Sequence, residues 1–228
     1  MGDALRVLST LALKGAVQSL AGHYQSTGGA QIDADFAPTL ALLERLRAGE
    51  AADVVILTRE GLDDLVREGS VAAENCVDLA RSYVGIAVKA GAAHPDISTE
   101  SALRASLLGA RSVAYSRLGA SGILFAKLIE RLGIAADINA KATVIPQGFT
   151  AERLVAGEAD LAVQQISELK QVEGIEVIGP IPLQLQTPAM FSAGRMVASS
   201  KMAQADRLLR YLASSEVAPL LRESGLEP

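Results

Sequence analysis

Apolar residues follow two alternating patterns along the first seventy positions. Short runs such as residues 5–9 and the DVVIL segment at 53–57 are apolar over a few positions, which is typical of buried strands. Between these runs, apolar residues such as Leu13, Val17 and Leu20 recur at helical spacing and predict an amphipathic helix. The order strand, helix, strand, helix predicts an α/β layer with mostly parallel strands.

Turn and capping residues divide the rest of the chain in the same way. Gly28-Gly29 and Gly49 stop predicted helices, and Thr58 and Thr99 start new ones. We expect strands near 5–9, 31–37, 53–57, 77–90, 111–115, 143, 160–164, 175–178 and 188–197, and helices over 13–24, 39–46, 59–66, 99–108, 119–132, 150–156 and around 208–212.

The run at 77–90 is longer than the other predicted strands and contains no turn signal. Such a strand can cross from one sheet to another, and a second extended run at 187–197 can return. We therefore expect two α/β lobes joined by two crossing strands. One lobe comprises residues 1–80 plus 196–228 and the other 81–195, with a ligand cleft between them lined by strand-to-helix turns.

The predicted strand-to-helix turns are rich in hydroxyls, amides and glycines, at 9–10, 38–39, 58–59, 116–122, 147–150 and 164–167. A helix start presents free backbone N–H groups and a partial positive charge, so it stabilises a small anion. In the turn at 116–122, Ser121 adds a hydroxyl and Arg117 a guanidinium suited to a carboxylate. The competing interpretation of each turn is ordinary helix capping.

Composition narrows the kind of ligand. A net charge of -5 without a Lys/Arg stripe argues against a nucleic-acid partner. The single cysteine, Cys76, excludes an internal disulfide, and the two histidines do not form a zinc motif. We expect no metal and no cofactor, and a small anion as ligand.

The sequence gives no strong enzyme motif. The segment 119–122 lacks the spacing of a nucleophile elbow, and no histidine follows it. Candidate proton-transfer groups are Tyr115, Glu168, Glu60 and His23, although acids in a first helical turn are common for capping reasons alone.

No apolar run reaches the ~18 residues that span a bilayer, and the first residues lack the apolar core of a secretory signal. We expect either a cytoplasmic protein or a periplasmic one whose signal has been removed.

Five segments occur in the order and spacing of one family: RVLSTLALKGAV, DFAPTLALLERLRAGEAADVVIL, VDLARSYVGIAVKAG, SRLGASGILFAKLI and VAGEADLAVQQISE. In them the chain resembles the molybdate-type periplasmic solute-binding proteins of ABC transporters. The resemblance implies a hinged two-lobed periplasmic-binding-protein fold, an oxyanion ligand held by hydroxyls and backbone amides, a monomer, and a transporter permease as partner.

The resemblance also implies site residues. It places hydroxyl sites at Ser9 or Thr10 and at Thr39, a helix-start contact near Ser121, a backbone contact near Phe149 and the family's tyrosine position at Gln165. Arg81, Ser82 and Arg117 flank these positions in this chain and complete the expected ligand-binding residues. Where the family has a tyrosine, this chain has Gln165, and Ala80-Arg81-Ser82 replaces the usual Ala-Arg-Asn. Free arginines favour a ligand with carboxylates over molybdate.

Two other functions fit the same features. The chain also resembles aconitate isomerases, which implies a double-bond shift in a tricarboxylate by proton transfer. A cytoplasmic ligand-sensing domain is the third possibility.

Overall fold

The computed structural model describes residues 4–228 and divides them into two compact units. The first unit holds the residues up to 82 together with 189–228, and the second holds 83–188. We expected the chain to return at 195/196. The return falls earlier because β10 (Ala189–Met196) pairs with β3 and β4 of the first unit and therefore belongs to it.

The first unit is built on a five-stranded sheet in the order β2-β1-β3-β10-β4. Its first three strands are parallel, whereas β10 runs antiparallel to both of its neighbours. The strands are β1 (Leu5–Thr10), β2 (Ile32–Ala37), β3 (Val54–Thr58), β4 (Val71–Ser82) and β10.

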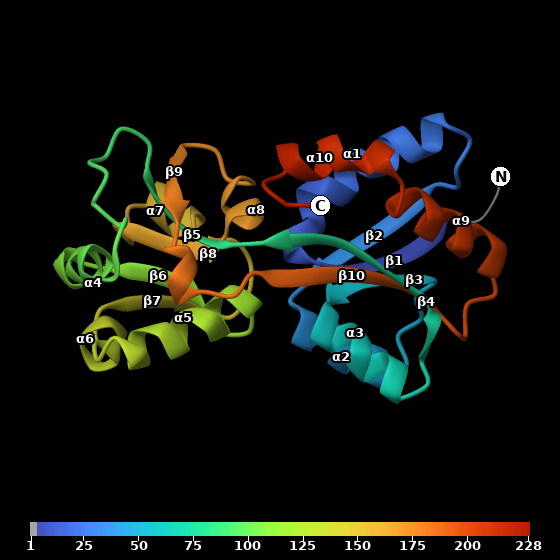
Figure 1. The fold of residues 1–228 in the computed structure, drawn as a ribbon, viewed down its shortest axis with the longest axis horizontal. Coiled ribbons are helices and arrows are strands. Elements are labelled where there is room, and N and C mark those ends of the chain that lie inside the picture. The colour runs from blue at the N-terminus through green and yellow to red at the C-terminus, as the bar shows by residue number, and fades with distance from the viewer. Residues whose placement is uncertain (1–3) are drawn as a thin grey trace. The chain divides into compact units, whose positions relative to one another are not determined.

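Helices cover both faces of this sheet (Figure 1). One face carries α1 (Lys14–Ser26), α9 (Met202–Leu212) and α10 (Ala218–Glu223), and the other carries α2 (Thr39–Arg47) and α3 (Arg59–Arg67). Short 3-10 turns η1 (Leu11–Leu13) and η3 (Ser215–Val217) precede α1 and α10. Alternate strand residues serve the two faces: Val7 joins the first core and Leu8 the second, as strand periodicity requires.

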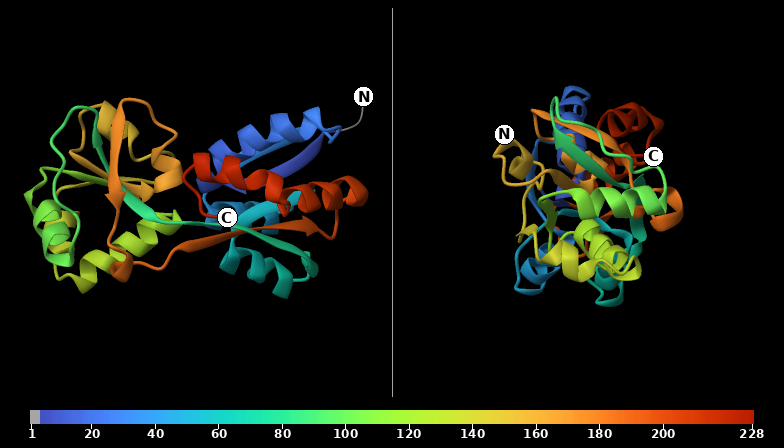
Figure 2. Two further views of the ribbon diagram at one scale, coloured as in Figure 1. Left: turned by 45° about the horizontal axis from the view of Figure 1, so that its top comes forward. Right: turned by 90° about the vertical axis from the view of Figure 1, so that its left-hand side faces the viewer.

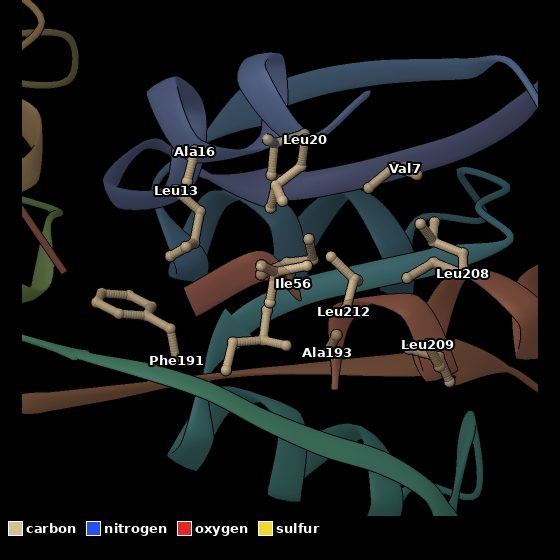
Figure 3. Packing of buried hydrophobic residues seen from close by; sticks show 14 of the residues in the cluster. Val7, Leu13, Ala16, Leu20, Ile56, Phe191, Ala193, Leu208, Leu209 and Leu212 are labelled. Carbon is tan, nitrogen blue, oxygen red and sulfur yellow. The ribbon is translucent and has the colours of Figure 1, made fainter. Parts of the chain in front are cut away.

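The core under α1 and α9 is drawn in Figure 3. Leu20 of α1 and Leu208 and Leu212 of α9 point toward the sheet, where Val7 and Ile56 are buried. The apolar residues whose helical spacing predicted α1 and α9 are therefore the residues that pack in this core.

The second unit repeats the arrangement with the order β7-β6-β8-β5-β9. Here β7, β6 and β8 are parallel, and β5 is antiparallel to β8 and β9. The strands are β5 (Val84–Lys89), β6 (Val113–Ser116), β7 (Ala142–Ile145), β8 (Leu161–Gln165) and β9 (Ile175–Pro180).

The two faces of the second sheet differ in side-chain size. The face with the larger apolar side chains packs against α4 (Glu100–Gly109), α5 (Ala120–Arg131) and α6 (Ala135–Asn139). The opposite face presents alanines Ala87, Ala114 and Ala162 to the four-residue helices α7 (Glu152–Val155) and α8 (Ile166–Leu169). Figure 2 shows these layers from two further directions. A 3-10 turn, η2 (Leu183–Leu185), precedes the return to β10.

Most predicted elements are present within two residues of their expected ends, and Thr58 and Thr99 cap α3 and α4 through their hydroxyls. The short helices α6, α8 and α10 were not predicted, because four to six residues show too little periodicity. The first crossing run begins at Val71, and the strand pairing is interrupted at Tyr83. No helix in residues 4–228 combines the length and apolarity of a membrane span.

Candidate functional site

Hydroxyl groups gather where the parallel strands of the first unit end. Thr10 lies level with Ala37, and Ser9 lies between Phe36 and Ile56, so β1, β2 and β3 finish at one edge. The helices that follow begin there with Thr39 and, after Thr58, with Arg59. We call Ser9, Thr10, Thr39 and Thr58 the first polar edge.

The fold uses two of these four hydroxyls as acceptors. Thr39 Oγ1 accepts the backbone N–H of Thr58 (3.2 Å), and Thr58 Oγ1 accepts that of Gly61 (3.3 Å). Ser9 Oγ donates to the carbonyl of Thr10 (3.2 Å). Thr10 is 5% exposed, and its hydroxyl hydrogen-bonds to no described residue. The O–H protons of Thr10, Thr39 and Thr58 therefore remain available to an external acceptor.

Arg81 and Ser82 reach the same edge of the first sheet. Thr58 of β3 pairs with Phe191 of β10, which pairs with Ala80 of β4, so the last residues of β4 lie just past the level of Thr58. Arg81 is held through its backbone, which exchanges two hydrogen bonds with Glu227 (2.6 and 2.8 Å). Ser82 is buried, whereas Arg81 is exposed.

Three buried polar side chains lie at the corresponding edge of the second unit. Ser116 ends β6, Gln165 ends the neighbouring β8, and Ser121 lies in the first turn of α5. Ser116 Oγ and Ser121 Oγ are buried without a hydrogen-bond partner among the described residues, whereas the Gln165 side chain accepts the Glu168 N–H in a capping box. We call these three residues the second polar edge. A buried unpaired polar group costs about 1–3 kcal/mol, so the edge is suited to a ligand that supplies the partners.

Two glycines allow the start of α5 to pack closely against the end of β6. A Cβ on Gly122 would lie 1.6 Å from the Ser116 carbonyl oxygen, so only glycine allows this approach. A Cβ on Gly119 would lie 2.7 Å from Ser116 Oγ and 3.8 Å from Ser121 Oγ, which places both hydroxyls beside the helix start. The first helical bond in α5 runs from Ile123 N–H to the Gly119 carbonyl (3.1 Å), leaving the earlier N–H groups for an anion.

The loop after β7 is held by Gln164, a residue that the sequence analysis did not select. Its Oε1 accepts from the N–H (2.8 Å) and the hydroxyl (3.0 Å) of Thr150, and its Nε2 donates to the Gly148 carbonyl (2.9 Å). These bonds fix the segment around Phe149 at the carboxyl end of the second sheet. A backbone contact of Phe149 with a ligand stays a prediction.

Glu168, a candidate proton-transfer group in the sequence analysis, was not among the predicted ligand-binding residues. Its side chain is buried, and its Oε2 accepts the backbone N–H of Gln165 (3.3 Å), one arm of a capping box. Burial raises the pKa of Glu168 to about 8, against hydrogen bonds from the Gln165 backbone and the Gln164 side chain that lower it. Acids are common in the first helical turn, so the sequence carried no signal that this one is buried.

The arginines near the two edges differ in their partners. Arg59 donates to Asp63 and Asp78 (both 3.0 Å), so carboxylates already engage its guanidinium. The Arg117 backbone N–H donates to the Ile145 carbonyl (3.0 Å) and its side chain is exposed. Within the described part of the chain, the guanidinium groups of Arg81 and Arg117 have no hydrogen-bond or ion-pair partner. These two cations are available to a carboxylate.

The other candidate proton-transfer groups are less suited to a buried site. His23 Nδ1 lies 2.7 Å from Tyr211 Oη on the far side of the first sheet from α2 and α3, and Tyr115 Oη donates to Asn139 Oδ1 (2.7 Å). Glu60 is exposed. The described residues contain no cluster of three His, Cys, Asp or Glu side chains placed to hold a metal ion.

Comparison with known proteins gives one family. The sequence model described as "Bacterial extracellular solute-binding protein" matches residues 5–227. An aconitate isomerase from a Pseudomonas species is 39% identical over 231 aligned positions, which cover 98% of this chain and 87% of that protein.

Solved structures agree on the fold. The periplasmic molybdate-binding protein of Azotobacter vinelandii superposes with a TM-score of 0.83 at 16% identity, over 98% of this chain and 99% of that one. A sulfate-binding protein from Mycobacterium tuberculosis gives 0.80 at 16% identity, over 100% and 87%. The predicted two-lobed α/β binding-protein fold is confirmed.

Proposed function

Because this chain belongs to the bacterial extracellular solute-binding protein family, we propose that it binds a small organic anion through a carboxylate at its second polar edge. The observation that carries the proposal is the pair of buried, unpartnered hydroxyls of Ser116 and Ser121 beside the start of α5. Both groups and the free N–H groups of the helix donate hydrogen bonds, which is what a carboxylate accepts.

Two features favour an organic carboxylate over an inorganic oxyanion. The unpaired guanidinium groups of Arg81 and Arg117 match the planar, two-oxygen face of a carboxylate. Leu118 and Ile123 beside the second polar edge are 40% and 38% exposed, and they offer apolar surface to a carbon skeleton. The 39% identity with an aconitate isomerase also points to a tricarboxylate.

The proposal is tested by thermal shift with cis-aconitate, tricarballylate, citrate, sulfate and molybdate. A ligand at ~100-fold above its dissociation constant adds about 2.7 kcal/mol to the native state, which is readily detected. We expect a tricarboxylate to stabilise the protein and the inorganic ions not to. If only molybdate or sulfate stabilises the protein, the proposed carboxylate ligand is wrong and the ligand is an inorganic oxyanion.

Ser121→Ala identifies the site and Ser214→Ala is its matched control. Ser214 Oγ is also buried without a partner, but it precedes η3 in the first unit and belongs to neither polar edge. Both variants remove an unpaired buried hydroxyl, so both should raise ligand-free stability. Only Ser121→Ala should weaken tricarboxylate binding, and equal affinity of the two variants would remove Ser121 from the site.

A second candidate function is isomerisation of a bound tricarboxylate, favoured by the full-length similarity to an aconitate isomerase. The reaction is a 1,3-proton shift: one carbon loses a proton, the double bond moves, and the other carbon gains a proton, with no redox partner. Proton NMR of cis-aconitate incubated with the protein tests it directly. Growth of trans-aconitate signals supports an enzyme, whereas an unchanged spectrum with demonstrated binding supports a binding protein.

For the binding function we also propose a periplasmic location and delivery of the ligand, by a monomer, to an ABC-transporter permease. The family to which the chain belongs supports this setting. Uptake of the identified ligand by cells lacking the gene is the corresponding test, and normal uptake would argue for the isomerase.

A further inference from the structure

Glu168 differs from the other deeply buried acid in the described structure. Asp53 and Glu168 are 7% and 6% exposed. The Asp53 carboxylate has a cation, Lys201, at 3.6 Å and accepts from Ser199 Oγ (2.7 Å) and the Arg6 N–H (2.9 Å). Glu168 has no ion pair with any described residue, and the groups that hydrogen-bond to it are the Gln165 backbone N–H and the Gln164 side chain. An ionised carboxylate in such surroundings is unfavourable.

The elements around Glu168 do not supply the missing charge. Its helix α8 packs on β5, β8 and β9, and β8 contains no charged residue. On β5, Lys89 Nζ donates to the Val155 carbonyl (3.3 Å). On β9, the Glu176 carboxylate accepts from the Gly91 N–H (3.0 Å) and lies 2.6 Å from His94 Nε2. Neither side chain is an ion-pair partner of the Glu168 carboxyl, whose pKa is raised by burial and lowered by hydrogen bonds from the Gln165 backbone and the Gln164 side chain.

Glu168 also lies beside the groups assigned to ligand binding. It accepts a hydrogen bond from the backbone of Gln165, a member of the second polar edge, and both follow β8, the strand next to β6 and Ser116. A charge on Glu168 would therefore develop close to where an anion is held.

We propose that Glu168 holds a proton in the ligand-free protein, that the second polar edge accepts its anion only in this neutral state, and that ionisation of Glu168 opposes binding. The effect on ligand binding rests on the proposed function, whereas the protonation of Glu168 does not. Two like charges brought together in a water-poor site repel strongly, so one of them must be neutralised or excluded. Burial raises the pKa of Glu168 to about 8, which leaves the group neutral at pH 7 and charged in mild alkali.

The first experiment needs no ligand. The protein is labelled with glutamate carrying carbon-13 at the side-chain carboxyl, and the carboxyl signals are followed from pH 4 to pH 10. Glu168→Gln identifies the Glu168 signal by its disappearance. We expect that signal to titrate near pH 8, several units above those of exposed glutamates. Titration together with the exposed glutamates would overturn the proposal.

The second experiment measures affinity for tricarballylate by calorimetry between pH 7 and pH 9.5. This saturated tricarboxylate is fully ionised across the range and has no double bond to shift. If binding requires neutral Glu168, affinity of the unaltered protein should fall about 30-fold over the range. Glu168→Gln should show an affinity that changes less than twofold with pH. A 30-fold fall that persists in this variant would overturn the proposal.

Glu100→Gln is the matched control, since Glu100 is an exposed first-turn acid of α4. It should keep the pH dependence of the unaltered protein. Absence of tricarballylate binding at every pH would sink the proposed carboxylate function, while the titration would still decide whether Glu168 holds a proton.

Discussion

The contact between Gly122 and the end of β6 gives the sharpest structural prediction. Replacing Gly122 by alanine would place a methyl carbon 1.6 Å from the carbonyl oxygen and 2.7 Å from the carbonyl carbon of Ser116. Both atoms belong to the backbone, so no side-chain rotation can relieve the overlap. The start of α5 would have to move away from β6.

The magnitude follows from two opposing effects. Alanine in a helix is favoured over glycine by about 1 kcal/mol. Overpacking costs about 1–3 kcal/mol when side chains can adjust, and more when they cannot. Because the contact here is with backbone, we expect a net loss of at least about 2 kcal/mol. For a chain of 228 residues this lowers the Tm by roughly 4–8 °C.

Thermal unfolding by circular dichroism measures the effect, and Gly109→Ala provides the control. Gly109 ends α4, and a Cβ there would meet no atom within 4 Å. That variant should be unchanged or more stable by up to about 1 kcal/mol. Gly122→Ala should also weaken tricarboxylate binding, because moving α5 separates Ser121 from Ser116. A Tm for Gly122→Ala equal to that of Gly109→Ala would refute the close seating of α5 on β6.

Three further predictions concern the second polar edge. Ser116→Ala should raise ligand-free stability by about 1 kcal/mol, measured by urea unfolding, and lower tricarboxylate affinity, measured by calorimetry. Glu168 has a pKa raised from 4.5 to about 8, so native stability should decline as pH rises through that window, because the unfolded chain releases the proton first. The decline in the free energy of unfolding should be about 4 kcal/mol between pH 5 and pH 8.5, measured by urea unfolding. Glu168→Gln should remove it, and an identical decline in the variant would argue against a buried proton. Arg117→Lys keeps the charge but loses the planar fork, so tricarboxylate affinity should fall about tenfold, and unchanged affinity would place Arg117 outside the site.

The sequence predicted the fold better than the chemistry of the site. Strand and helix periods locate the parallel strands and their long helices because those patterns are local. Thr58 was identified as a cap and Thr99 as a helix start for the same reason. Burial of Glu168, the pairing of Arg59 with Asp78 and the hydrogen bonds of Gln164 depend on residues distant in the chain, which no local pattern reveals. The predicted ligand-binding residues lie in or next to the two polar edges, and their contact with a ligand stays a prediction.

The alanine-lined face of the second sheet has a consequence for motion. Helices of four residues, such as α7 and α8, are too short to be stable by their own hydrogen bonds, so they depend on the sheet beneath them. Segments of this kind open locally at lower free energy than the core strands. Amide hydrogen exchange should therefore be faster at 166–169 than in β6 or β8. An anion held beside Gln165 would slow that exchange, so a bound ligand would be recorded as protection of a single helical turn.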